Sequence, residues 1–87
     1  MDHSFRIRFG DVECELGVAS TQESGFVAWA LRIAPDGQLT PLQDRQGRLV
    51  LATAPTAAEA VATVRAHGAR AFGPEQPSAA FHSAADR

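Results

Sequence analysis

The chain carries few of the side chains that perform catalysis or bind metals. Its three histidines, His3, His67 and His82, are far apart, and no pair has the spacing of metal ligands. Cys14 is the only cysteine, so no intrachain disulfide can form. The seven glycines are isolated from one another, so no loop resembles a phosphate-binding loop. The sequence therefore predicts no catalytic residue, no cofactor, no metal and no enzyme.

Glu13 and Glu15 are the one pair of carboxylates on a common face, and a β-hairpin explains them. Residues 5–16, FRIRFGDVECEL, alternate between apolar and charged side chains on both sides of Gly10-Asp11. Glycine at the first turn position suits a type II′ turn. A two-residue turn there predicts five cross-strand pairs: Phe9–Val12, Arg8–Glu13, Ile7–Cys14, Arg6–Glu15 and Phe5–Leu16. Both glutamates then face arginines, and Cys14 points into the core as a small apolar residue.

The rest of the chain predicts more strands, then one helix. Residues 26–33 indicate a central strand, residues 38–42 a weak strand containing Pro41, and residues 48–53 a third strand, which together form an antiparallel meander. Thr56-x-x-Glu59 matches a capping box, so a helix is expected over residues 57–67, with Gly68 as its C-cap. Residues 69–72 indicate a short strand or an anchored segment.

These elements predict an α+β fold. It consists of a five-stranded, mainly antiparallel sheet, made of the hairpin and the meander, with one helix packed on one face. The domain is expected to span residues 1–72, followed by a flexible tail over residues 73–87, which contains two prolines and no periodic pattern.

Composition narrows the possible partners. The net charge is -2, and residues 1–72 contain eight acidic residues against seven arginines, which is no basic excess for a nucleic-acid binder. There is no lysine, asparagine or tyrosine, and the alanine-rich composition is typical of GC-rich bacterial or phage genes. The N-terminus lacks an apolar signal segment, and no apolar run is long enough to cross a membrane, so we expect a cytoplasmic protein.

The central strand is apolar on both faces, which raises the question of what covers each face. One face carries Trp29 with Val27, Leu31 and Ile33, and the other is lined largely by alanine. We expect the alanine-lined face to contact a protein partner or a second copy of the chain, through Phe26, Ala28, Ala30, Val50 and Ala52. The small face of the helix is then expected to pack over Trp29 and the two phenylalanines of the hairpin. The alternative is that the alanine-lined face receives the helix and that the hairpin covers the face of Trp29.

A second hypothesis is nucleic-acid binding by an arginine-bearing sheet face. Its candidate residues are Arg6, Arg8, Arg32, Arg45 and Arg48. The stretch from Trp29 to Val64, with its glycine turn, strand and Thr56-x-x-Glu59-Ala60 cap, resembles small bacterial domains in which strands precede one helix, including HicB-like antitoxin domains. These features cover under half of the chain and occur at any junction between a strand and a capped helix, so no family is assigned on them.

The sequence therefore predicts a small non-enzymatic interaction or regulatory module of bacterial, phage or mobile-element origin. It would act by binding a protein partner or itself as a homodimer, and it needs no membrane and no metal. An antitoxin-like regulator that binds nucleic acid is the alternative.

Overall fold

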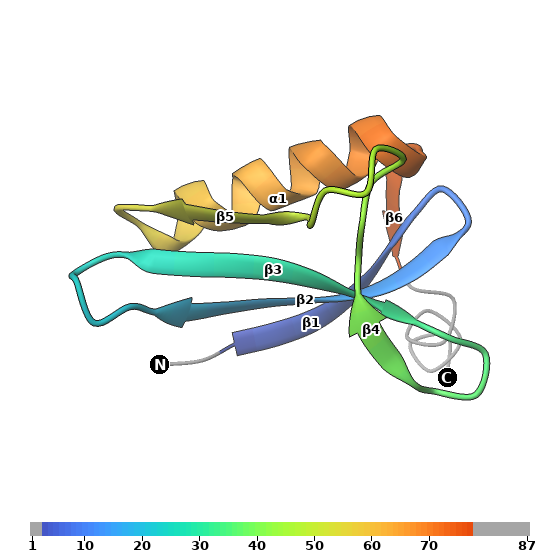
Figure 1. Cartoon of the computed structure of the whole chain (residues 1–87), viewed down its shortest axis with the longest axis horizontal. Helices are drawn as coiled ribbons and strands as arrows, with labels where there is room; N and C mark the ends of the chain where they lie inside the picture. Colours follow the sequence, from blue (N-terminus) through green and yellow to red (C-terminus); the bar gives the residue numbers. More distant parts are fainter. Residues whose placement is uncertain (1–2, 78–87) are drawn as a thin grey trace.

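The computed structural model describes residues 3–77. These residues form an α+β fold in which one helix packs on a mainly antiparallel sheet, as the sequence predicts (Figure 1). In chain order the elements are β1 (His3–Phe9), β2 (Val12–Ser20), β3 (Phe26–Ile33), β4 (Leu39–Pro41), β5 (Leu51–Ala54), α1 (Ala57–Phe72) and β6 (Glu75–Pro77).

The hairpin of β1 and β2 has the predicted register, and all five expected pairs are present. It extends further than predicted, because His3 lies opposite Val18 and Ser4 opposite Gly17. Gly10 has a φ of +58°, which a residue with a side chain rarely adopts. A Cβ at Gly10 would also collide with the backbone carbonyl of Phe72. The turn thus needs glycine both for its backbone conformation and for the close approach of the end of α1.

The predicted meander of residues 26–53 is wrong. Both β4 and β5 are antiparallel to β3 and lie along the same edge of it, β4 beside its end and β5 beside its beginning. Residues 42–50 leave the sheet between them and return, held by the backbone bonds from Leu42 N–H to the Ala30 carbonyl and from Ala30 N–H to the Val50 carbonyl, both 3.0 Å long. We call residues 42–50 the excursion. It rises toward the C-terminal end of α1 (Figure 1).

Helix α1 begins as predicted and ends later. The amide of Glu59 donates to Oγ1 of the N-cap Thr56 over 3.2 Å, which confirms the cap. The predicted C-cap, Gly68, is instead buried inside the helix, and α1 continues through residues 69–72 to a C-cap at Gly73. Gly68 is needed for packing, because a Cβ there would lie 2.7 Å from Cδ2 of the buried Phe9 ring.

The core lies between α1 and the face of the sheet to which Ile7 and Phe9 point. Helix α1 contacts β2, β3 and β5, and Ala60 and Val64 lie on its buried side with Gly68. Trp29 was expected to pack under the helix with the phenylalanines of the hairpin, but it lies on the opposite face, since its neighbours Ala28 and Ala30 point into the core. Phe9 does pack against the helix.

The first residues of the predicted tail belong to the sheet. Residues 75–77 form β6, which is antiparallel to β1 with Gln76 opposite Arg8. Arg65 of α1 holds this strand through Glu75, with Nε 2.8 Å from Oε1 and a second bond from Nη2 to Oε2. The sheet therefore includes residues that lie past the expected boundary at residue 72. The rest of the predicted tail, with Phe81 and His82, lies outside the described residues.

Candidate functional site

The residues predicted to form a protein interface are part of the core. Ala28, Ala30 and Val50 are at most 3% exposed, and Phe26 and Ala52 are partly buried against them. Helix α1 covers this side of the sheet, so these side chains are not available to a partner, and their assignment as an interface is corrected. The alternative hypothesis said that the alanine-lined face receives the helix and that the hairpin covers the face of Trp29. Its first part is confirmed, because α1 packs on the alanine-lined face.

The arginines of the nucleic-acid hypothesis do not share one surface. Arg6 and Arg8 alternate with the buried Ile7 and therefore point to the face opposite α1. Arg32 lies opposite Cys14 and points to the helix side, and Arg45 and Arg48 belong to the excursion, next to the end of α1. Arg8 is also close to Glu13, with Nη1 3.9 Å from Oε2. The structure therefore divides the predicted set between two sides of the molecule.

The face opposite α1 carries apolar side chains that no element of residues 3–77 covers. We call it the open sheet face. Its apolar residues come from β3, β4 and β5, and they are Val27, Trp29, Leu31, Ile33, Leu39, Pro41 and Leu51. Leu39 is 45% exposed and Leu51 is 47% exposed. Helix α1 is the only helix within residues 3–77, and it covers the opposite side of the sheet from this face (Figure 1).

Trp29 lies at the centre of the open sheet face. Gly17 is directly opposite it on β2, and a Cβ at Gly17 would lie 2.8 Å from the indole Nε1. The missing side chain lets the indole lie close to the backbone of β2. Leu51 is the neighbour of Trp29 on β5. The result is a half-buried aromatic ring bordered by an exposed leucine.

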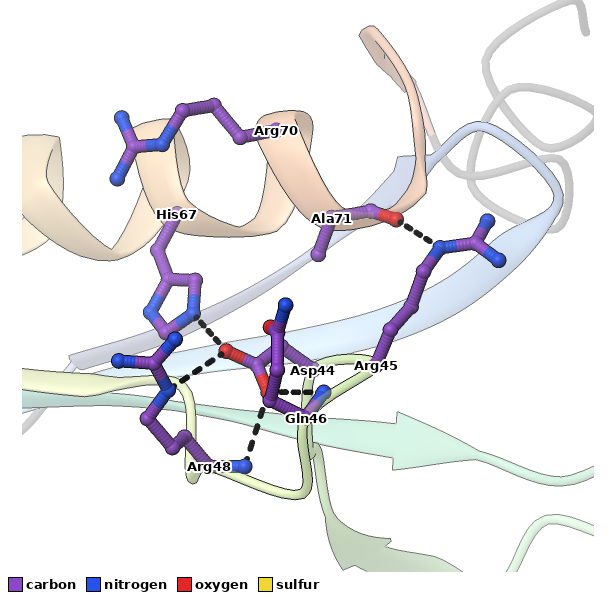
Figure 2. Close-up of a pocket in the computed structure, with 7 residues that line it drawn as sticks. All are labelled: Asp44, Arg45, Gln46, Arg48, His67, Arg70 and Ala71. Atoms are coloured by element: carbon purple, nitrogen blue, oxygen red, sulfur yellow. Dashed lines mark hydrogen bonds and ion pairs between the residues drawn. The ribbon is translucent and has the colours of Figure 1, made fainter.

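A polar depression of about 370 Å³ separates the excursion from the last turns of α1 (Figure 2). Asp44 organises it, although its side chain is only 7% exposed. Its Oδ1 accepts the backbone N–H groups of Gln46 and Arg48, each over 2.9 Å, and its Oδ2 lies 2.9 Å from Nε2 of His67 and 3.7 Å from Nε of Arg48. These bonds hold the pKa of Asp44 below 3.8, and the hydrogen bond with His67 has the largest effect.

The contacts around the depression join the excursion to α1. Arg45 donates from Nε to the carbonyl of Ala71 over 3.0 Å, which satisfies a carbonyl in the last turn of α1. The residues that line the depression include no hydroxyl or thiol that His67 would activate as a nucleophile. Figure 2 shows Arg70 extending away from Asp44, so the arginines do not converge on one ligand position. The site attaches the excursion to the helix.

Other chemistry-bearing groups give no alternative site within residues 3–77. Cys14 is fully buried, as predicted, and burial with the nearby Glu13 raises its pKa to about 11, which keeps it a thiol. No three His, Cys, Asp or Glu side chains of the described part gather as metal ligands would. Among the described residues, no helix has both the length and the apolar character needed to span a bilayer.

Comparisons with known protein families, with curated proteins and with solved structures give no match in any of the three.

The sequence reasoning missed two features. It assigned Trp29 to the core, although the period-two pattern alone leaves both faces of β3 apolar. It also did not connect Asp44 with His67, because no local signal joins two residues 23 positions apart.

Proposed function

We propose that this chain is a non-enzymatic protein-binding module whose contact surface is the apolar part of the open sheet face. One observation carries the proposal: Trp29 lies half-buried at the centre of a face that no element of residues 3–77 covers, with Leu51 beside it. Contiguous apolar patches of this kind usually mark interaction sites in soluble domains. Tryptophan is also among the residues most enriched at the energetic centres of interfaces.

The surroundings of the patch support a protein ligand. Glu13 and Glu15 of β2, with Arg6 and Arg8 of β1, border the apolar residues on one side. Each arginine faces a glutamate, so this border has no net charge. An apolar centre with a neutral polar margin is the usual anatomy of a protein interface. A nucleic-acid surface instead needs an excess of cations along one face. The division of the arginines between two sides of the molecule therefore favours the protein ligand.

A substitution at the rim of the indole tests the proposal. Leu51→Glu places a charge beside Trp29 at a position that is already half exposed, so the fold should be retained. Ala62→Glu is the matched control, because it adds the same charge on an exposed position of α1. Tagged wild-type and variant proteins are used for affinity capture from extracts of the source cells that also contain the untagged chain.

The proposal expects a protein, either the untagged chain or another, that the wild type and Ala62→Glu retain and Leu51→Glu loses. Equal retention by all three proteins would show that the open sheet face is not the contact surface. If the wild type instead retains nucleic acid, and the variants Arg6→Gln and Arg8→Gln lose it, the ligand of this face is nucleic acid and not a protein.

A further inference from the structure

We infer that the occupant of the open sheet face is a second copy of this chain, in an isologous dimer that packs sheet on sheet. The inference rests on the proposed function, because it names the partner of the same surface. Three features of the described residues support it: the area of the face, the order of its apolar residues along the strands, and the protection of the sheet edges.

The area suits a stable dimer. The six strands of the sheet contain 34 residues in all. At a spacing of about 4.8 Å between strands and about 3.3 Å per residue, the whole face, including its arginine–glutamate border, measures about 540 Å² in projection. Two such faces give about 1,100 Å² in projection, and the rough side-chain surface buries more than its projection. The dimer therefore reaches the size of specific interfaces, about 1,200–2,000 Å².

The apolar residues are arranged so that the face complements itself. In the register of the sheet, Trp29 lies beside Leu51 and Leu31 beside Pro41, in adjacent rows across the strands. A two-fold axis in the interface plane, perpendicular to the strands and between these two rows, superposes β3 on β3 of the second copy in the opposite direction. The row of Trp29 then packs on the row of Leu31 of the second copy.

The outer rows meet in the same way. The axis that superposes the inner rows places Val27 of one copy on Ile33 of the other, because these residues lie one row further out on each side. On the open sheet face, each of the four apolar residues of β3 therefore meets an apolar residue of the second copy. The arginine–glutamate pairs of β1 and β2 lie to one side of this apolar contact, and each pair is neutralised within its own chain. A like-charge conflict between copies is thereby avoided.

The sheet edges offer the second copy a poorer surface than the face. β4 contains three residues and ends at Pro41, β5 contains four residues and is followed by Pro55, and β6 contains three residues and ends at Pro77. Short strands with proline are the devices that prevent edge-to-edge pairing. The edges therefore favour contact through the face over edge-to-edge pairing of two sheets.

The test is the mass of the full chain in solution, measured by sedimentation equilibrium from about 1 µM to about 100 µM, since dimers depend on concentration. The wild type should approach twice the 9.2 kDa of one chain. Leu51→Glu should remain a folded monomer and bind its second copy at least about 100-fold more weakly, because the axis places this carboxylate on Pro41 of the second copy, where it loses its water without gaining a partner. Ala62→Glu should dimerise as the wild type does. Trp29, the only tryptophan, should shift its emission to the blue as the dimer forms.

The outcomes separate the two proposals. A wild type that stays monomeric over the whole range overturns the second copy as occupant and leaves the open sheet face to another protein. A wild-type dimer that Leu51→Glu does not weaken overturns the inference, because the two copies then meet through another surface. The proposed function is overturned only if affinity capture also shows equal retention by the wild type, Leu51→Glu and Ala62→Glu. A dimer weakened equally by Leu51→Glu and Ala62→Glu also overturns the inference, because the effect would then be one of added charge and not of position.

Discussion

Replacing Gly68 with alanine should destabilise the domain, although glycine is unfavourable inside a helix. The substitution normally stabilises a helix interior by about 1 kcal/mol. Gly68, however, lies on the buried side of α1, and the added Cβ would be 2.6 Å from Cζ and 2.7 Å from Cδ2 of Phe9. The Phe9 ring is 0% exposed, so it has no solvent space into which it can turn. Either the ring or the helix must move.

The size of the effect follows from two opposing contributions. Forcing a methyl group into a filled core costs about 1–3 kcal/mol. Subtracting the gain in helix propensity, about 1 kcal/mol, leaves an expected loss of about 1 kcal/mol in the free energy of unfolding. In a domain of this size such a loss lowers the melting temperature by roughly 4–8 °C. Urea unfolding followed by circular dichroism, with the thermal midpoint as a second measurement, determines it.

A double-mutant cycle with Phe9→Leu identifies the cause. Leucine removes part of the ring, so Gly68→Ala should be less harmful in that background, with a coupling of about 1 kcal/mol or more between the two positions. Ala62→Gly, at an exposed position of the same helix, measures the propensity contribution by itself. The reasoning is refuted if Gly68→Ala raises the stability by about 1 kcal/mol, or if the two substitutions are additive within about 0.5 kcal/mol.

Two further predictions concern the attachments of α1. Asp44→Asn should lower the stability at neutral pH. The pKa of Asp44 is depressed in the folded state, so its contribution is complete above pH 3.8 and is lost as the pH falls through the folded-state value. The difference between wild type and variant should therefore shrink in acid, and a constant difference from pH 7 to acid would contradict this. Glu75→Gln removes the ion pair with Arg65 and should cost about 0.5–1 kcal/mol, because both groups are partly exposed. Hydrogen exchange should then be faster in β6, and unchanged exchange there would show that Arg65 does not hold the strand.

The hairpin could be predicted from the sequence because its register and turn depend on residues that are close together in the chain. The alternation of apolar and charged residues in β1 and β2 permits one register, and a slip by one residue would place charged side chains in the core. Gly10 then sets the position of the turn. The N-terminus of α1 was predictable for a similar reason, since Thr56 and Glu59 cap it through contacts three residues apart.

The features that were predicted wrongly depend on contacts between distant parts of the chain. Gly68 looks like a helix end in the sequence, and only the ring of Phe9, 59 positions earlier, explains why it is glycine within the helix. The excursion of residues 42–50 is held to the sheet by Ala30 and to the helix by His67. Nothing within residues 39–54 shows that they form two strands along one edge of β3.

The most consequential choice that the sequence left open was which face of β3 the helix covers, and packing geometry explains the answer. Ala28 and Ala30 on β3 belong to one core cluster with Ala60 and Val64 on α1, and small side chains on both surfaces let the helix approach the sheet closely.

A helix seated on the other face would have to bury the indole of Trp29 with its leucine neighbours, and its own short side chains would leave voids around that ring. Close packing on the alanine side therefore leaves the large apolar residues on the face that the helix does not cover. The same distribution of side chains that stabilises the domain creates the surface on which we propose that a second copy binds.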